Sequence, residues 1–391
     1  MSDTIQKQLN EERAQDQQTV ARRHRKKLHW WSRGSGIRLR IWMAVNILLL
    51  GALSYGVLAA LGTEARGPRY LGLGRPAGVP GIRELLAPAP PQVPDKSVFS
   101  APDGKYFGVS TVEAPWSASE LGAVADHAGV RPTMAEYFVR WNADFDPKAV
   151  SKAYDHGTLP VLAWEPWEGE EAGHTDQPGY SLASIINGSH DEYLERFAKA
   201  VADQKWPVAI RFAHEMNGTW YPWSEQENGN KKGEYVQAWR HVHDLFSQAG
   251  ADNVIWVWSP NILRPVPNVD IAQLYPGDDY VDWIGMVGYG TKTESKAEQT
   301  FGPTIAVLRG ITKKPMLITE TGREPSPSLK ADWTTDFLDW LGRQPDVLGF
   351  IWFQRDTDQG GKADWRFDET PAAQQAFADG IRKLKLADGL G

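Results

Sequence analysis

Two glutamates, Glu215 and Glu320, carry the side chains of this 391-residue sequence that are best placed to do chemistry. Each closely follows a short apolar stretch typical of a buried strand, and they lie 105 residues apart. That interval equals three strand–helix units of about 35 residues, so on an eight-stranded barrel their strands nearly face each other across the mouth. Two facing carboxyl groups about 5–5.5 Å apart can cleave a glycosidic bond with retention, one protonating the glycosidic oxygen while the other attacks the anomeric carbon.

Aromatic residues accompany these glutamates, because the chain contains 18 tryptophans. A lone glutamate at a strand end is equally explained by a surface salt bridge or a helix cap. Ring side chains at several strand ends favour sugar binding instead, since flat rings stack on the apolar faces of sugars. The rings expected at the mouth are Trp164, Trp220, Trp223, Trp258, Tyr289 and Trp352.

Eight short apolar stretches, alternating with longer amphipathic ones, must position these side chains. Strands are expected at residues 106–109, 133–138, 159–163, 208–212, 254–257, 283–287, 316–319 and 348–353. The clearest helices are expected at 192–204, 233–249, 296–309, 333–342 and 372–384. This alternation predicts the α/β class, as a (β/α)8 TIM barrel. An open doubly wound sheet is the alternative, but no glycine-rich phosphate turn follows the first strand.

The thirteen residues from Arg211 to Trp223, RFAHEMNGTWYPW, carry the most specific signal in the chain. They closely resemble the acid/base segment of glycoside hydrolase family 26, the β-mannanase family of the large retaining barrel clan. Residues 258–261, 275–285 and 318–322 are similar to the same family, and the resemblance covers roughly residues 103–385. It implies a retaining, endo-acting β-glycoside hydrolase with Glu215 as general acid/base and Glu320 as nucleophile.

The same resemblance implies roles for the neighbouring residues. His214 would contact the sugar and tune the acid, Tyr289 would donate a hydrogen bond to the nucleophile, and Trp352 would form the floor of the subsite where cleavage occurs. The other expected substrate-binding residues are Trp220 and Trp223 on the leaving-group side, Trp164 and Glu165 on the opposite side, and Asn217, Trp258 and Asn261.

The sugar itself stays open, because members of this family cut mannans, mixed-linkage β-glucans or β-1,3-xylans. We expect β-1,4-mannan first, although the Tyr-Pro pair after Trp220 is at least as close to the β-glucan-cutting members. A hydrolase that trims a nascent exopolysaccharide beside a polysaccharide synthase is an alternative role. A non-catalytic, polysaccharide-binding barrel is an alternative class.

The N-terminal hundred residues differ from the rest. Residues 1–40 hold ten lysines and arginines against four acidic residues, a net charge of +6. Because the whole chain has a net charge of −7, the remaining residues carry −13. Residues 41–62 form an apolar stretch long enough to span a bilayer, and the basic side is expected to stay inside. The sequence therefore predicts a cytoplasmic arm, a signal anchor, a Pro/Gly-rich linker at 63–100 and an extracytoplasmic barrel domain at 101–391. A cleaved, secreted form is the alternative.

Other partners are not expected. The acidic body would repel nucleic acid. The chain has no cysteine, and the pair His241 and His243 would point to different faces of a helix, so neither a metal nor a cofactor is predicted. We expect a monomer that binds a polysaccharide or oligosaccharide.

Overall fold

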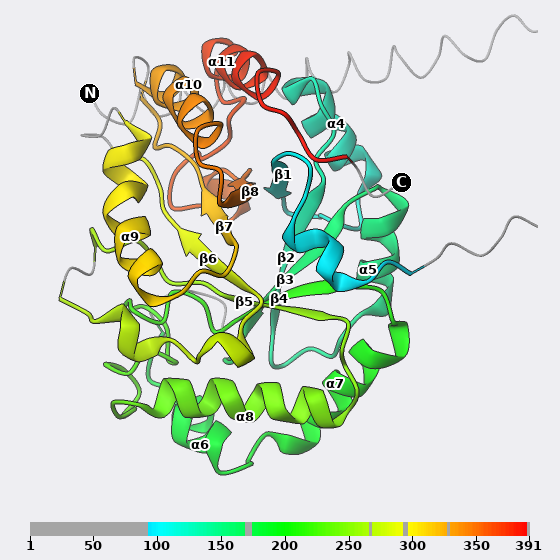
Figure 1. Ribbon diagram of the computed structural model, residues 1–391, viewed down its shortest axis with the longest axis vertical. Coiled ribbons are helices and arrows are strands. Elements are labelled where there is room, and N and C mark those ends of the chain that lie inside the picture. The colour runs from blue at the N-terminus through cyan, green and yellow to red at the C-terminus, as the bar shows by residue number, and fades with distance from the viewer. Residues whose placement is uncertain (1–92, 169–173, 266–267, 292–295, 327–328, 389–391) are drawn as a thin grey trace, which may run out of the picture. The chain divides into compact units, whose positions relative to one another are not determined.

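All eight expected strands form, and within the described residues they pair in parallel, in chain order, into one closed barrel (Figure 1). The computed structural model describes residues 93–168, 174–265, 268–291, 296–326 and 329–388. The strands are β1 (Tyr106–Ser110), β2 (Met134–Arg140), β3 (Leu159–Glu165), β4 (Val208–Phe212), β5 (Val254–Trp258), β6 (Trp283–Val287), β7 (Met316–Thr321) and β8 (Val347–Phe353). The predicted parallel barrel is therefore confirmed.

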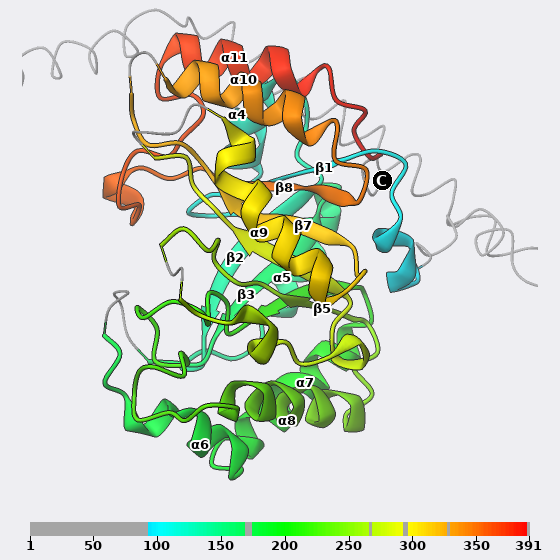
Figure 2. The same cartoon turned by 60° about the vertical axis from the view of Figure 1, so that its left-hand side comes forward.

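Helices follow the strands and surround them (Figures 1 and 2). Two begin where the sequence places a cap followed by proline. Asp146 and Thr370 accept bonds from the first turns of their helices, and Pro147 and Pro371 fit there because that turn needs no N–H donor. The helices are α4 (Ala118–Ala128), α5 (Pro147–Asp155), α6 (Leu182–Ile186), α7 (Asp191–Gln204), α8 (Glu234–Gln248), α9 (Ala297–Ile311), α10 (Lys330–Leu341) and α11 (Pro371–Ile381).

Strand alternation divides the apolar core into two layers. One strand position faces the barrel interior, where Val161, Ile255 and Leu317 belong to one buried cluster. The next position faces the helices, where Leu162 and Ile318 belong to the other cluster. This alternation decides which side chains at the strand ends can reach the mouth.

The N-terminal part of the chain is described only from residue 93. The predicted arm, the predicted anchor and most of the predicted linker lie outside the described residues. Within the part that the structure does describe, no helix has the length and apolar character needed to cross a membrane. Residues 96–100 of the predicted linker form a 3-10 helix, η1 (Lys96–Ser100), with Phe99 buried. The Lys96 ammonium donates to the Val254 carbonyl at 2.7 Å, so these residues pack on the barrel.

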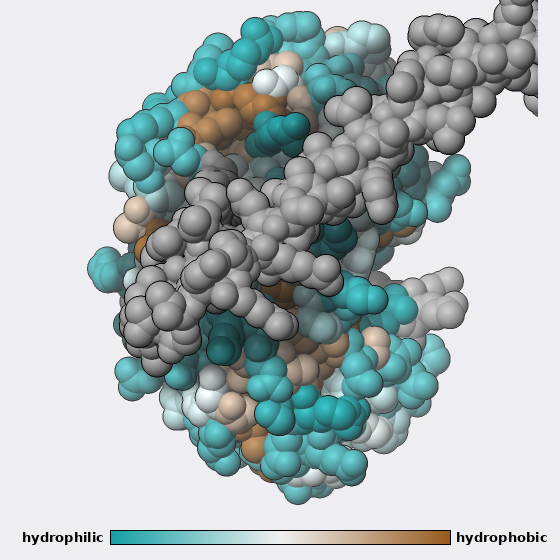
Figure 3. Space-filling view, turned by 90° about the vertical axis from the view of Figure 1, so that its right-hand side faces the viewer, coloured by the Kyte–Doolittle hydropathy of each residue, from teal (hydrophilic) through white to brown (hydrophobic). Residues whose placement is uncertain are grey.

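On the face that Figure 3 shows, the visible described residues are mostly hydrophilic. The large apolar side chains that are exposed within the described residues lie in several separate segments of the chain: Val93, Val98, Val112, Trp116 and Val307.

Candidate active site

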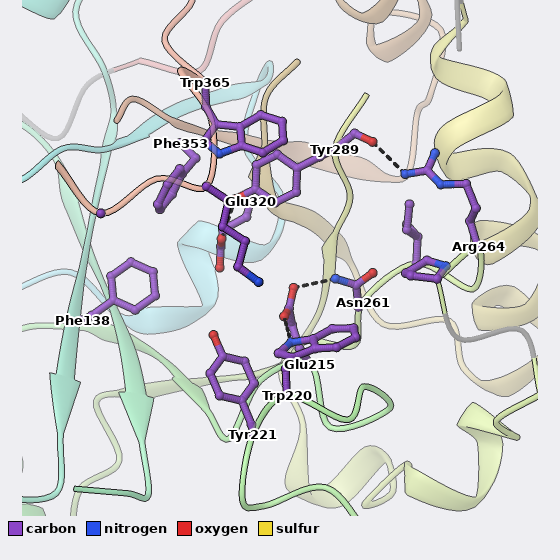
Figure 4. A pocket seen from close by; sticks show the side chains of 14 residues that line it. Phe138, Glu215, Trp220, Tyr221, Asn261, Arg264, Tyr289, Glu320, Phe353 and Trp365 are labelled. Atoms are coloured by element: carbon purple, nitrogen blue, oxygen red, sulfur yellow. Dashed lines mark hydrogen bonds between the residues drawn. The ribbon is translucent and has the colours of Figure 1, made fainter. Parts of the chain in front are cut away.

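A cavity of about 360 Å³ lies at the carboxyl ends of the strands, and Glu215 and Glu320 both line it. Figure 4 shows their two carboxyl groups directed into the same space. The cavity wall also contains six ring side chains, Phe138, Trp220, Tyr221, Tyr289, Phe353 and Trp365, and two basic side chains, Arg264 and Lys362.

Glu215 is buried at 8% exposure and held by two side-chain donors. The Asn261 amide donates to its Oε1 at 2.6 Å, and the Trp220 indole donates to its Oε2 at 2.5 Å (Figure 4). Burial raises the pKa of Glu215 to about 7, and the negative charge of Glu320 adds to that rise. Near neutral pH this carboxyl group can therefore both hold and release a proton.

The backbone that carries Glu215 is fixed in an unusual conformation. Ala213 and Glu215 have φ values of 44° and 53°, in the left-handed region that side chains disfavour. Two strong hydrogen bonds hold the segment there: the Glu215 amide donates to the Ser259 carbonyl at 2.7 Å, and the Trp223 indole donates to the His214 carbonyl at 2.6 Å. The carboxyl group is therefore aimed by the fold before any ligand binds.

Glu320 reaches the cavity because β7 is irregular. The pairing of β6 with β7 shifts by one residue between Met286, opposite Ile318, and Val287, opposite Glu320. Such an irregularity re-aims the next side chain. In this position one carboxyl oxygen lies 2.5 Å from an Arg211 nitrogen, and the other accepts the Tyr289 hydroxyl at 2.7 Å. The two glutamates thus sit in contrasting surroundings, because Glu320 is ion-paired and Glu215 is not.

The sequence profile described as glycosyl hydrolase family 26 matches residues 175–334. The chain belongs to glycoside hydrolase family 26. Endoglucanase H of Acetivibrio thermocellus is 29% identical over 280 residues, covering 68% of this chain and 29% of that protein. A mannan endo-1,4-beta-mannosidase of Thermothelomyces thermophilus is 30% identical over 249 residues, covering 62% of this chain and 46% of that protein. The aligned region thus spans less than half the length of either relative.

A family 26 β-mannanase from Bacteroides ovatus has the same fold. The TM-score is 0.54 at 21% sequence identity, over 72% of this chain and 90% of that one. At this identity the likeness establishes the barrel fold alone. The chemistry of the present chain has to be argued from its own side chains.

Three rings predicted to bind sugar lie in the core of this family 26 barrel instead. Trp164, Trp258 and Trp352 are each 0% exposed. They occupy the strand positions that face the helices: the Trp164 ring packs 4.4 Å from Phe197 of α7, and the Trp352 ring 5.2 Å from Phe377 of α11. Their prediction as sugar-binding residues is wrong, because the adjacent strand position is the one that faces the mouth.

Three more predicted residues lie behind the cavity wall. His214 is buried, its Nε2 lies 3.3 Å from the Tyr221 hydroxyl, and it is 3.9 Å from a Glu165 oxygen. Burial and the nearby Arg211 charge lower the pKa of His214, so it is neutral, whereas burial raises the pKa of Glu165 to about 7. Trp223 is also buried and stacks on Tyr221 at 4.2 Å. None of the three lines the cavity, so the structure does not support the direct sugar contact expected of them. His214 and Trp223 instead contact Tyr221, which does line the cavity.

Asn217 has a supporting position too. It is fully buried and exchanges two 2.8 Å hydrogen bonds with the backbone of Asn261. Asn261 lines the cavity and donates to Glu215. Trp220 and Tyr289 also line the cavity, where Trp220 donates to Glu215 and Tyr289 donates to Glu320. Asn217 therefore orients Asn261 and does not itself reach the space where a ligand would lie.

The sequence analysis missed Trp365, which lines the cavity in the loop after β8. Its ring packs 4.5 Å from the Tyr289 ring, and its backbone carbonyl accepts the Trp352 indole at 2.8 Å. The buried Trp352 thus helps to position Trp365, whose ring lines the cavity where the sequence analysis expected the Trp352 ring. Within the described residues, no group of three or more His, Asp or Glu side chains is arranged to hold a metal ion.

Proposed function

We propose that this chain is a retaining, endo-acting β-glycoside hydrolase, with Glu215 as general acid/base and Glu320 as nucleophile. One observation carries the proposal: two carboxyl groups line a single cavity, one ion-paired and the other with a pKa raised to about 7. A retaining mechanism needs these two different states in the same place.

In the first step a carboxylate oxygen of Glu320 attacks the anomeric carbon, while the Glu215 proton moves to the departing glycosidic oxygen. The sugar is then esterified to Glu320, which no longer carries a negative charge. Because that charge contributes to the raised pKa of Glu215, its loss lowers this pKa and prepares Glu215 to act as a base. In the second step Glu215 accepts a proton from water, and the water oxygen displaces Glu320 from the anomeric carbon.

The substrate that we propose is β-1,4-mannan, which the mannosidase relative supports by its name. A mixed-linkage β-glucan is the second candidate. The 280-residue alignment with an endoglucanase favours it, and so does Tyr221, which lies in the Tyr-Pro pair after Trp220 and lines the cavity. Initial rates on mannan, glucomannan, lichenan, xylans and cellulose, with analysis of the products, separate the two.

The catalytic assignment is tested with Glu215→Ala and Glu320→Ala, using Glu168→Ala, an exposed glutamate outside the cavity, as the matched control. Each cavity variant is expected to lose activity by about a thousandfold or more while melting like the parent, and the control to stay active. Azide separates the roles: it should restore turnover of activated glycosides by Glu215→Ala with a β-glycosyl azide as product, and by Glu320→Ala with the α anomer. Near-parental activity in either cavity variant would contradict the catalytic assignment.

We also propose that residues 41–62 anchor the protein in the cell membrane with the barrel outside, as the charge asymmetry around this apolar stretch supports. The full-length protein is then expected in the membrane fraction, with the barrel released by protease added outside intact cells. A soluble mature form that begins after this stretch would support the cleaved form instead.

A further inference from the structure

A buried arginine links the proposed nucleophile to a carboxyl group that the mechanism does not use. Arg211, on β4, is 0% exposed. One terminal nitrogen lies 2.5 Å from Glu320, and the other donates to Glu136, on β2, at 2.9 Å. Glu136 is fully buried and does not line the cavity, so it can influence the reaction only through the groups that it touches.

Small side chains around Arg211 leave room for this arrangement. The Arg211 Nε donates to the Ser259 hydroxyl at 3.0 Å, and that hydroxyl lies 2.7 Å from the Thr319 hydroxyl. Gly285 faces both: a Cβ there would lie 2.5 Å from the Ser259 Cβ and 2.9 Å from a Thr319 methyl carbon. Arg211 is therefore held at three nitrogens, by Glu136, Ser259 and Glu320.

The two carboxyl groups that contact Arg211, those of Glu136 and Glu320, differ in their protonation. Burial raises the pKa of Glu136 to about 8, against the opposing effect of Arg211, so Glu136 is largely protonated at neutral pH. The Glu136 Oε1 still accepts the Arg211 hydrogen bond, but the positive charge of the guanidinium is balanced mainly by Glu320. Several other titratable groups of the described residues interact electrically with Glu136 or Arg211. They are His214, Glu215 and Tyr221 after β4, Glu165 on β3, Tyr289 after β6 and Arg355 after β8.

We propose that Glu136 is a positioning residue: it anchors one end of the Arg211 guanidinium so that the other end stays against Glu320. This inference rests on the proposed function, because it takes Glu320 as the nucleophile. An arginine side chain can adopt several rotamers, and a partner at each of the two terminal nitrogens of its guanidinium selects one of them. Without Glu136, Arg211 keeps its charge but loses the bond that points its second nitrogen at the nucleophile.

The test compares two substitutions at one position. Glu136→Ala removes the acceptor, whereas Glu136→Gln keeps an oxygen where Oε1 lies and carries no charge. In Glu136→Ala the Arg211 guanidinium is no longer held against Glu320, so kcat/KM should fall by at least about tenfold. Glu136→Gln should restore kcat/KM to about the parental value.

Tyr137→Phe, the next residue on β2, is the matched control, because it alters a buried side chain on the outer face of the strand. Ser259→Ala removes a different anchor of Arg211 and should also lower kcat/KM. Parental kcat/KM in every folded variant that loses an anchor, or Glu136→Gln as impaired as Glu136→Ala, would overturn the inference. Glu320→Ala distinguishes the positioning role from the proposed function: if it is inactive while Glu136→Ala has a parental kcat/KM, only the positioning role fails, and if it is active, the proposed function fails.

Discussion

Replacing Trp220 by phenylalanine tests how the cavity sets the acidity of Glu215. The Trp220 indole donates to Glu215 Oε2 at 2.5 Å, and this bond holds the pKa of Glu215 lower than burial alone would leave it. A hydrogen bond to an ionised acceptor is stronger than one to the neutral form, and the difference is about 1.4 kcal/mol, equivalent to about one pH unit. In Trp220→Phe, Glu215 should therefore keep its proton to a higher pH.

The measurement is kcat/KM from initial rates between about pH 5 and pH 10, whose alkaline limb reports the protonated acid of the free enzyme. We expect this limb to move up by about one unit, although the plateau itself drops because a cavity ring has changed. Trp116→Phe is the control: Trp116 is 43% exposed, and its indole donates to Asp146 at 3.2 Å, outside the cavity. An alkaline limb that stays in place or moves down in Trp220→Phe would refute the reasoning.

Other substitutions test the cavity wall and the core beside it. In Gly218→Ala the new Cβ would lie 2.5 Å from the Trp220 ring, so the indole must shift; kcat/KM should fall by about tenfold. Gly122→Ala, where a Cβ meets nothing within 4 Å, should leave kcat/KM unchanged. Trp352→Ala should cost about 3–5 kcal/mol of unfolding free energy in denaturant titration, since its ring is fully buried. Trp365→Ala should instead raise KM several-fold with a smaller change in stability, and the reverse pattern for these two tryptophans would contradict their placement.

The barrel could be predicted because apolar stretches mark buried parallel strands whatever surrounds them. β4 and β6 have the predicted bounds, whereas β3 continues to Glu165 and β2 to Arg140. The polar residues at these ends still pair between β2 and β3, but a search for apolar stretches does not include them. The two catalytic candidates were found for the same reason: each follows a recognisable strand.

The errors in the predicted site have a different origin. Alternation along β3 already required Trp164 to face away from the mouth if Val161 faced the interior, so this error could have been avoided from the sequence. The placement of Glu320 could not, because it depends on a one-residue shift in the pairing of β6 and β7. Trp365 lies in a loop without periodicity, and no pattern relates such a residue to the cavity.

The burial of so many indoles has an optical consequence. An indole in apolar surroundings emits at shorter wavelength than one in water, so Trp164, Trp258 and Trp352 should keep the native fluorescence blue-shifted and out of reach of a soluble quencher. Binding of a sugar can perturb directly only the rings that line the cavity, chiefly Trp220 and Trp365. Intrinsic emission is therefore a sensitive reporter of unfolding in this protein, while ligand titrations require difference spectra from which the buried background has been subtracted.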